Sequence, residues 1–181
     1  MKCNLFPLLV VLITFVFPAM AAEDDFGDST GPVVIKKAWK EAEVHIPAKI
    51  TDSDLINFKI FEMPRYKYFI DATTLKTSKS DNSVRYAIVV QTSGGVRNVF
   101  FEGIRCDTGQ YKLYAAAIWG QSLVPLATPE WKKIKGLGVT VYRTDLYRDF
   151  LCRDRLIRGS EHDILELMRY TPDSNDDSDL D

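Results

Sequence analysis

Three long apolar segments in close succession constrain the fold more than any other feature of the chain. They are separated only by short connections that contain Ser93-Gly94-Gly95 and Asp107-Thr108-Gly109, and adjacent glycines are typical of a tight hairpin turn. Strands joined by turns this short pair in the antiparallel direction. The sequence therefore predicts an antiparallel meander made of Val84–Thr92, Val96–Cys106 and Tyr111–Trp119.

Segments on both sides of the meander add to the predicted fold. Leu55–Phe61 and Tyr66–Asp71 have strand character and are separated by a turn at Met63-Pro64. The segment from Thr144 to about Leu156 has the apolar spacing of a helix that covers a sheet. Its first residue is a suitable helix cap, and an acidic residue follows in the first turn. We therefore expect about five strands and one covering helix.

A carboxylate in the middle of the most apolar strand needs a partner. Side-chain alternation places Glu102 on the same face as Cys106, and a buried carboxylate is costly unless it is paired. Arg85 on the preceding strand is opposite or diagonal to Glu102, depending on whether Gly94-Gly95 or Ser93-Gly94 forms the turn. The sequence thus predicts a buried or half-buried Glu102–Arg85 ion pair.

The first 21 residues have the three parts of a secretory signal peptide. Lys2 gives a positive start, Leu5–Phe17 is apolar, and Ala19-Met20-Ala21 is a small-x-small cleavage site. The apolar run has 13 residues, fewer than the roughly 20 that a membrane-spanning helix needs. We expect cleavage near Ala21, export of the chain, and no transmembrane segment in the mature chain.

Both ends of the mature chain are acidic and poor in large apolar residues. We expect a flexible N-terminus over 22–31, a single domain over 32–172, and a disordered tail over 173–181. Of the 23 basic and 25 acidic residues, one basic and nine acidic residues lie outside 29–172, which leaves that part with a net charge of +6. An exported location and acidic tails both argue against nucleic acid as a partner.

Two cysteines remain after the leader, which contains Cys3, is removed. Disulfides persist in exported compartments, so we expect Cys106 to bond to Cys152. Their spacing is too wide for a C-x-x-C redox motif, and His45 and His162 form no spaced ligand cluster. No metal or cofactor is expected. The predicted fold is therefore α+β: a single domain with an antiparallel meander and a disulfide-linked helix packed on one face.

Three further segments contain some or all of the features of a helix. Thr128–Ile134 has a cap residue followed by proline and predicts a short helix. A final helix follows Ser160, with Ile164, Leu167 and Met168 on its apolar side. The segment 33–49 has some helical spacing, but its proline and its charges leave its structure open.

Several segments occur in an order that resembles a known family. They are YKYFIDATTL, VRYAIVVQTSGGVRNVFFEGIRC, YKLYAAAIW, EWKKI and DFLC. Together they look like the cryptic neisserial protein one-like (CNP1-like) family of exported proteins of Gram-negative bacteria. The resemblance covers most of 39–152, and NVFFEGIRC is its most specific part, whereas Lys76–Asn82 departs from the pattern. It implies an exported domain and no catalytic residue.

Two classes of function follow from these observations. The first is a non-enzymatic periplasmic module that binds an envelope protein or an anionic envelope component. Arginine side chains suit phosphate and carboxylate ligands, and five of them surround the predicted helix: Arg143, Arg148, Arg153, Arg155 and Arg158. The second is a hydrolase that uses Glu102 with His45 or His162. It would need a second polar group close to Glu102, and the sequence places none there.

Overall fold

The computed structural model describes residues 38–60 and 65–170 of the chain. The chain divides into two units, Met1–Lys37 and Ala38–Asp181, and every described residue belongs to the second. The predicted signal peptide, the acidic N-terminus, the Met63-Pro64 turn and the acidic tail lie outside the described residues.

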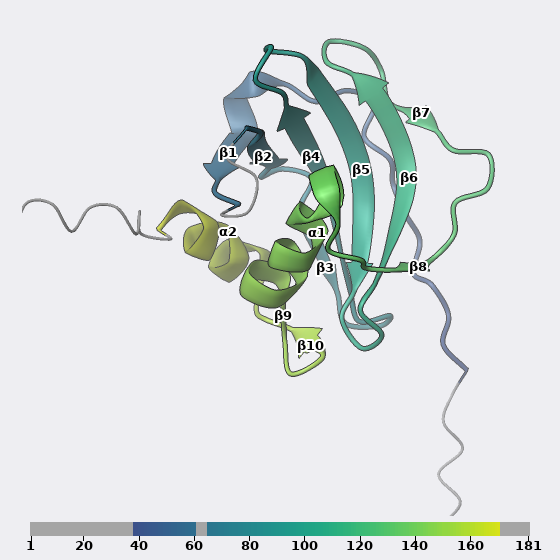
Figure 1. Ribbon diagram of the computed structural model, residues 1–181. Coiled ribbons are helices and arrows are strands. Elements are labelled where there is room, and N and C mark those ends of the chain that lie inside the picture. Colours follow the sequence, from purple (N-terminus) through teal and green to yellow (C-terminus); the bar gives the residue numbers. More distant parts are fainter. Residues whose placement is uncertain (1–37, 61–64, 171–181) are drawn as a thin grey trace, which may run out of the picture. The chain divides into compact units, whose positions relative to one another are not determined.

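One antiparallel sheet of eight strands forms the body of the second unit (Figure 1). Its main order is β1-β2-β4-β5-β6-β7, while β3 pairs with β4 and β8 pairs with β6. The antiparallel sheet is confirmed, although it has more strands than predicted, because three short ones join its five long ones. The strands are β1 (Leu55–Phe58), β2 (Lys67–Asp71), β3 (Lys76–Ser78), β4 (Ser83–Gln91), β5 (Arg97–Arg105), β6 (Gln110–Ile118), β7 (Val124–Pro125) and β8 (Lys132–Lys133).

The helical elements differ from the prediction at both ends of the covering helix. Helix α1 (Tyr142–Asp145) continues as a π-helical segment, Leu146–Leu151, and a hairpin of β9 (Cys152–Arg153) and β10 (Leu156–Ile157) follows. The φ angles of Asp154 and Arg155 are 51° and 65°, as a two-residue hairpin turn with positive φ requires. The helix begins at Tyr142, so Thr144 lies inside it and is not its cap. The predicted helix to Leu156 is also wrong beyond Leu151.

The other helix predictions had different outcomes. Helix α2 (Glu161–Arg169) follows Ser160, which forms a reciprocal capping box with Asp163, so the final helix is confirmed. The short helix over Thr128–Ile134 is wrong, because Lys132 and Lys133 form β8 along the edge of β6 instead. From Ala38 to Ile50 the chain has no helix. No described helix is long and apolar enough to cross a membrane.

Separate hydrophobic cores lie on the two faces of the sheet. On the first face, α1, the π-helical segment and α2 pack against the sheet, and the fully buried side chains include Tyr68, Ile88, Leu146, Leu151 and Ile164. On the second face, the core includes Val89, Val99, Phe101 and Ala115 and is flanked by Val44 and Ile46 of the N-terminal segment. The predicted helix cover over the face of Glu102 is confirmed.

The predicted disulfide is present and joins the sheet to its helical cover. Cys106 directly follows β5, and Cys152 directly follows the π-helical segment; their Cα atoms are 5.6 Å apart. Both residues are buried. The bond therefore holds the C-terminal end of β5 against the C-terminal end of the π-helical segment.

Residues 38–50 are fixed to the second face by buried polar groups. Asp81 accepts hydrogen bonds from the backbone N–H of Ala42 at 2.8 Å and from Ser83 Oγ at 2.6 Å, and its Oδ2 lies 2.5 Å from Arg85 Nη2. Glu41 accepts hydrogen bonds from Lys112 Nζ and Tyr114 Oη, both at 2.7 Å. This segment is therefore anchored by a few specific bonds at its start.

We expect Asp81 to make the free energy of unfolding depend on pH. Burial alone would raise the pKa of Asp81, but hydrogen bonds from Arg85, Ser83 and the Ala42 N–H outweigh it and lower this pKa from 3.8 to about 2. Because the folded pKa lies below the unfolded one, the stabilisation is present above pH 4 and is lost as the pH falls towards 2. The loss corresponds to about 2 kcal/mol of unfolding free energy.

Urea unfolding at a series of pH values tests this expectation. Asp81→Asn should flatten the dependence of the unfolding free energy on pH between pH 5 and 2, whereas Glu130→Gln, at an exposed position, should leave it unchanged. An identical slope in wild type and Asp81→Asn would contradict the assignment.

Candidate functional site

The position of Glu102 is set by the length of the β4–β5 loop. Thr92 and Val96 are joined by a backbone hydrogen bond of 2.9 Å, so the loop comprises three residues, Ser93-Gly94-Gly95, and not two. Gly95 has a φ of 83°, which suits the last position of such a loop. One extra loop residue moves every β4 side chain to the opposite face. Tyr86, and not Arg85, is therefore the cross-strand partner of Glu102.

The predicted Glu102–Arg85 pair is wrong, although the carboxylate is buried and paired as expected. Glu102 is fully buried and forms its ion pair with Arg143, at the start of the helical cover. The Nε atom of Arg143 lies 3.0 Å from Glu102 Oε2. Tyr142 Oη donates to Oε1 at 2.9 Å, and Tyr86 Oη donates to Oε2 at 3.4 Å. Arg85 instead binds Asp81 on the other face.

The electrostatics of this cluster favour the charged form of Arg143 and the neutral form of its tyrosines. Burial would lower the pKa of Arg143, but the hydrogen bonds and negative charge of Glu102 raise it. Burial first, and the charge of Glu102 second, raise the pKa values of Tyr86 and Tyr142 well above 10.0. The guanidinium also lies 4.0 Å from the centre of the Tyr111 ring, in the geometry of a cation–π contact.

A β-bulge beside Glu102 changes which residues of β6 share its face. The register of β5 and β6 shifts between Phe101 and Glu102, so Glu102 pairs with Leu113 while Phe101 pairs with Ala115. Bulges locally redirect side chains. As a result Ala115 and Ala117 belong to the second core, whereas the simple alternation pattern predicts that they share the face of Glu102.

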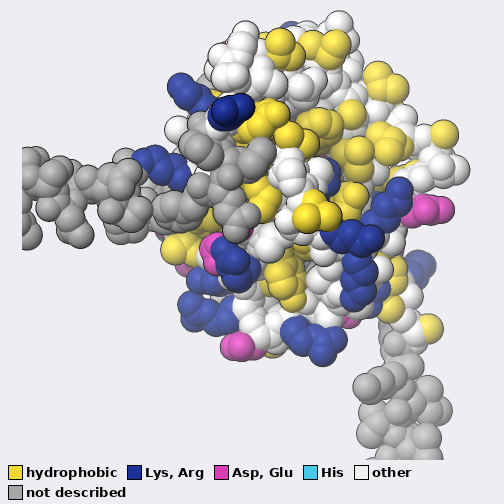
Figure 2. All heavy atoms as spheres, in the orientation of Figure 1, with side chains coloured by type: hydrophobic (Ala, Val, Ile, Leu, Met, Phe, Trp, Pro, Cys, Tyr) yellow, Lys and Arg dark blue, Asp and Glu magenta, His cyan; other side chains and the backbone are white. Residues whose placement is uncertain are grey.

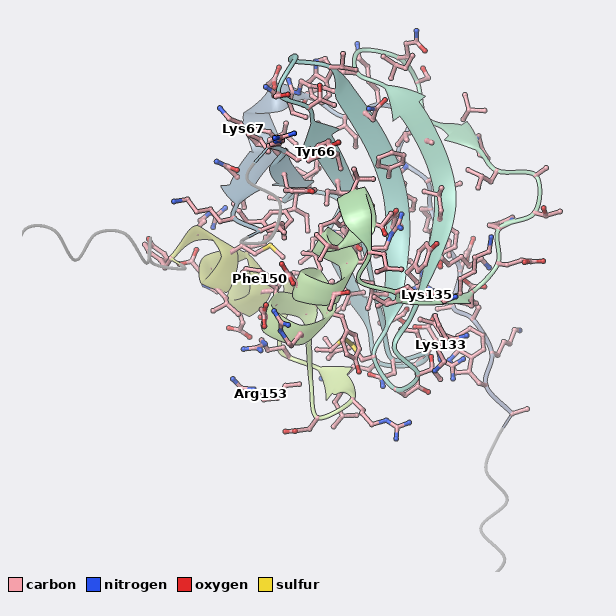
Figure 3. The ribbon with its side chains drawn as sticks, in the orientation of Figure 1. Tyr66, Lys67, Lys133, Lys135, Phe150 and Arg153 are labelled. Carbon is pink, nitrogen blue, oxygen red and sulfur yellow. A yellow bond between two sulfur atoms is a disulfide. The ribbon has the colours of Figure 1, made fainter. Side chains whose placement is uncertain are left out.

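A cationic cleft lies where β6, β8 and α1 meet, next to the Glu102–Arg143 pair. It has a volume of about 560 Å³ and is lined by Tyr111, Lys132, Lys133, Lys135, Thr140 and Arg143; we call it the lysine cleft. Lys132 pairs with Tyr111 across the two strands. Lys133 Nζ donates to the carbonyl of Thr108 at 2.6 Å. Figure 3 shows Lys133 and Lys135 on the segment that leads from β8 towards α1.

The charge of the lysine cleft is not neutralised at its surface. Four of its six lining residues are cationic and none is acidic. The charge of Arg143 is neutralised by Glu102, which is buried beneath the cleft surface. Lys132 and Lys135 form no ion pair with any described residue. The cleft therefore presents lysine ammonium groups that remain free to bind an anion.

Two other clefts formed by described residues have a more balanced chemistry. One, of about 730 Å³, includes Ser160 and Glu161, but Glu161 already accepts bonds from the Thr77 N–H and hydroxyl at 2.8 and 2.9 Å. The other, of about 540 Å³, includes His45 and Arg85, and each of these residues has an acidic partner. Neither cleft gathers unpaired charges of one sign.

Most arginines of the predicted anion-binding patch have partners within the protein. Arg148 contacts Asp145 and Asp149, Arg155 donates to the carbonyl of Asp107, and Arg158 donates to the carbonyl of Arg148. Arg153 is exposed on β9 (Figure 3). The arginine patch stays a prediction, and Arg143 is its only member that lines the lysine cleft.

The described residues do not bring Glu102 together with a histidine. His45 is exposed in the N-terminal segment, 3.8 Å from Glu43. His162 is exposed in the first turn of α2. Neither histidine forms a hydrogen bond with Glu102, whose oxygens are occupied by Arg143 and two tyrosines. Over 38–60 and 65–170, no group of three or more His, Cys, Asp or Glu residues could hold a metal ion.

The three lysines of the cleft were not among the residues predicted from the sequence to form a site. The signal available was the dense run Lys132-Lys133-Ile134-Lys135, which was interpreted as part of a short helix. On a helix Lys132 and Lys135, three residues apart, would share one side, while Lys133 would point elsewhere. The pairing of β8 with β6 instead places them around one cleft.

One comparison with known proteins gives a match. The model of the CNP1-like family matches residues 34–169, which confirms the resemblance found in the sequence and extends it to both sides. Neither the curated proteins nor the solved structures contain a match to this chain.

Proposed function

The chain belongs to the CNP1-like family, and we propose that it is a non-enzymatic periplasmic module that binds an anionic ligand in the lysine cleft. The observation that supports this best is the group of four cationic side chains around a cleft of about 560 Å³ whose six lining residues include no carboxylate. A cleft of this size accommodates a small molecule or a head group.

The chemistry of the cleft favours phosphate groups among the possible anions. Lys132, Lys133 and Lys135 supply ammonium groups, which are compact charges with three donors each on flexible stems. The planar fork of Arg143, which would favour a carboxylate, is already engaged by Glu102. A ligand with several phosphate charges would contact more than one lysine at once.

The periplasmic location is proposed from the sequence and is compatible with the disulfide. Residues 1–21 have the pattern of a secretory signal, and disulfides persist in oxidising compartments. A fusion to a reporter that folds only after export would test this location.

The absence of catalysis is proposed from the surroundings of Glu102. A general acid or base must reach its substrate, but this carboxylate is fully enclosed by Arg143, Tyr142 and Tyr86. Its burial thus suits a structural role in holding α1 against β5.

Anion binding can be measured by calorimetric titration with tripolyphosphate at low salt. Combined replacement of Lys132, Lys133 and Lys135 by glutamine should weaken binding roughly tenfold, since each exposed charged contact contributes about 0.2–1 kcal/mol. The matched control changes the exposed lysines Lys49, Lys67 and Lys79 to glutamine and should alter the affinity less than twofold.

Equal weakening in both variants would show that only net charge attracts the anion, and would overturn the assignment to the cleft. Thermal unfolding of each variant would show that the fold is retained, as expected for exposed lysines.

A further inference from the structure

The loop that borders the lysine cleft exposes large apolar side chains. Leu137 is 73% exposed and Val139 is 46% exposed, and both lie between β8 and α1. Lys132, Lys133 and Lys135 precede them directly in the chain. Figure 2 shows Lys and Arg side chains beside hydrophobic ones over the part of this face where Figure 1 draws β8 and α1.

The backbone holds these apolar side chains outward. A Cβ at Gly136 would lie 2.8 Å from Thr144 Oγ1, so this position packs closely on α1. Gly138 has a φ of 56°, a conformation that favours glycine. Thr140 Oγ1 donates to the carbonyl of Leu137 at 2.8 Å. The alternation Gly136-Leu137-Gly138-Val139 therefore forms a defined loop with an apolar tip.

We propose that this loop docks the domain on the surface of an anionic phospholipid bilayer, with Leu137 and Val139 entering the interface and the cleft lysines contacting lipid phosphates. The inference rests on the proposed function, because it identifies the anion in the lysine cleft as a lipid head group. An apolar tip flanked by lysines is suited to an interface that is apolar inside and negatively charged at its surface.

The size and charge of the patch favour a bilayer over a protein partner. Two exposed side chains provide far less area than the roughly 800 Å² per partner of a stable protein interface. Between residues 130 and 140 there are three lysines and one acid, Glu130, so the segment complements a uniformly negative surface. One apolar contact and one electrostatic contact, each weak alone, together give reversible membrane binding.

Vesicle flotation tests the proposal with protein produced from the full-length sequence. The protein should bind vesicles containing phosphatidylglycerol at least tenfold more strongly than vesicles of phosphatidylcholine alone. The variant Leu137→Ser/Val139→Ser should lose at least tenfold in vesicle binding while its affinity for tripolyphosphate stays unchanged. The matched control, Ile118→Ser/Val124→Ser, alters two other exposed apolar residues and should bind vesicles like the wild type.

The alternative outcomes distinguish a failure of this inference alone from a failure of the proposed function as well. If Leu137→Ser/Val139→Ser binds vesicles as well as the wild type, the docking loop is overturned while anion binding in the cleft stands. If the control variant loses binding instead, the membrane-facing surface lies at β6 and β7 and the inference is again overturned. If the wild type binds neither vesicles nor tripolyphosphate, both proposals fall.

Discussion

Replacement of Arg143 by methionine is expected to lower the free energy of unfolding by about 3–5 kcal/mol, because it leaves a buried carboxylate without its counter-charge. Glu102 is fully buried, and Arg143 is the only cation bonded to it among the described residues. Tyr142 and Tyr86 would still donate hydrogen bonds, but they bring no charge. Urea unfolding at pH 7 gives the free energy directly.

Two further variants distinguish the effect of losing the Glu102–Arg143 ion pair on the unfolding free energy from the effect of losing any arginine. Arg153→Met removes an exposed arginine and should change the unfolding free energy by less than about 0.5 kcal/mol. Glu102→Leu combined with Arg143→Met should recover much of the loss, since apolar residues of similar size often replace a buried pair at little cost. If Arg143→Met were no more destabilising than Arg153→Met, Glu102 would not depend on Arg143.

The choice of partner for Glu102 shows where the sequence stops being informative. Its burial followed from the apolar strand around it, and its need for a cation followed from the cost of burial. Its partner depended on a three-residue loop where a two-residue turn was expected, and that difference moved Arg85 to the other face. Side-chain alternation cannot correct such an error, because β4 is apolar on both faces.

The lysine cleft could not be predicted from the sequence for a different reason. Lys132 and Lys133 join the cleft because a strand of two residues pairs with the edge of β6, and two residues are too few to show alternation. Arg143 enters the same cleft from α1, far from Tyr111 in sequence. Long strands and the capped final helix could be predicted because their patterns extend over several residues, whereas this site depends on short contacts between distant segments.

The end of the covering helix illustrates a third limit. Apolar spacing continued through Cys152, so nothing in the periodicity stopped the helix at Leu151. The chain turns into a hairpin at Asp154 and Arg155, which both have positive φ, and the usual glycine that marks such turns is not present there. The disulfide could still be predicted, because it depended on the cysteine count and the expected compartment and not on where the helix ends.

Replacement of both Cys106 and Cys152 by alanine is expected to lower the free energy of unfolding by about 4 kcal/mol. The bond spans 46 residues, and closing a loop of that length removes roughly this much conformational freedom from the unfolded chain. Loss of the buried sulfurs adds a smaller packing term. The measurement is urea unfolding of the double variant beside the wild type, without and with a thiol reductant.

The reductant provides the internal control for this prediction. It should shift the urea midpoint of the wild type towards that of the double variant and leave the variant unmoved. A wild-type midpoint that is insensitive to complete reduction would contradict the prediction. Because the bond and the Glu102–Arg143 pair both hold the helical segment on the same face of the sheet, we expect the double cysteine variant combined with Arg143→Met to lose its cooperative unfolding transition altogether.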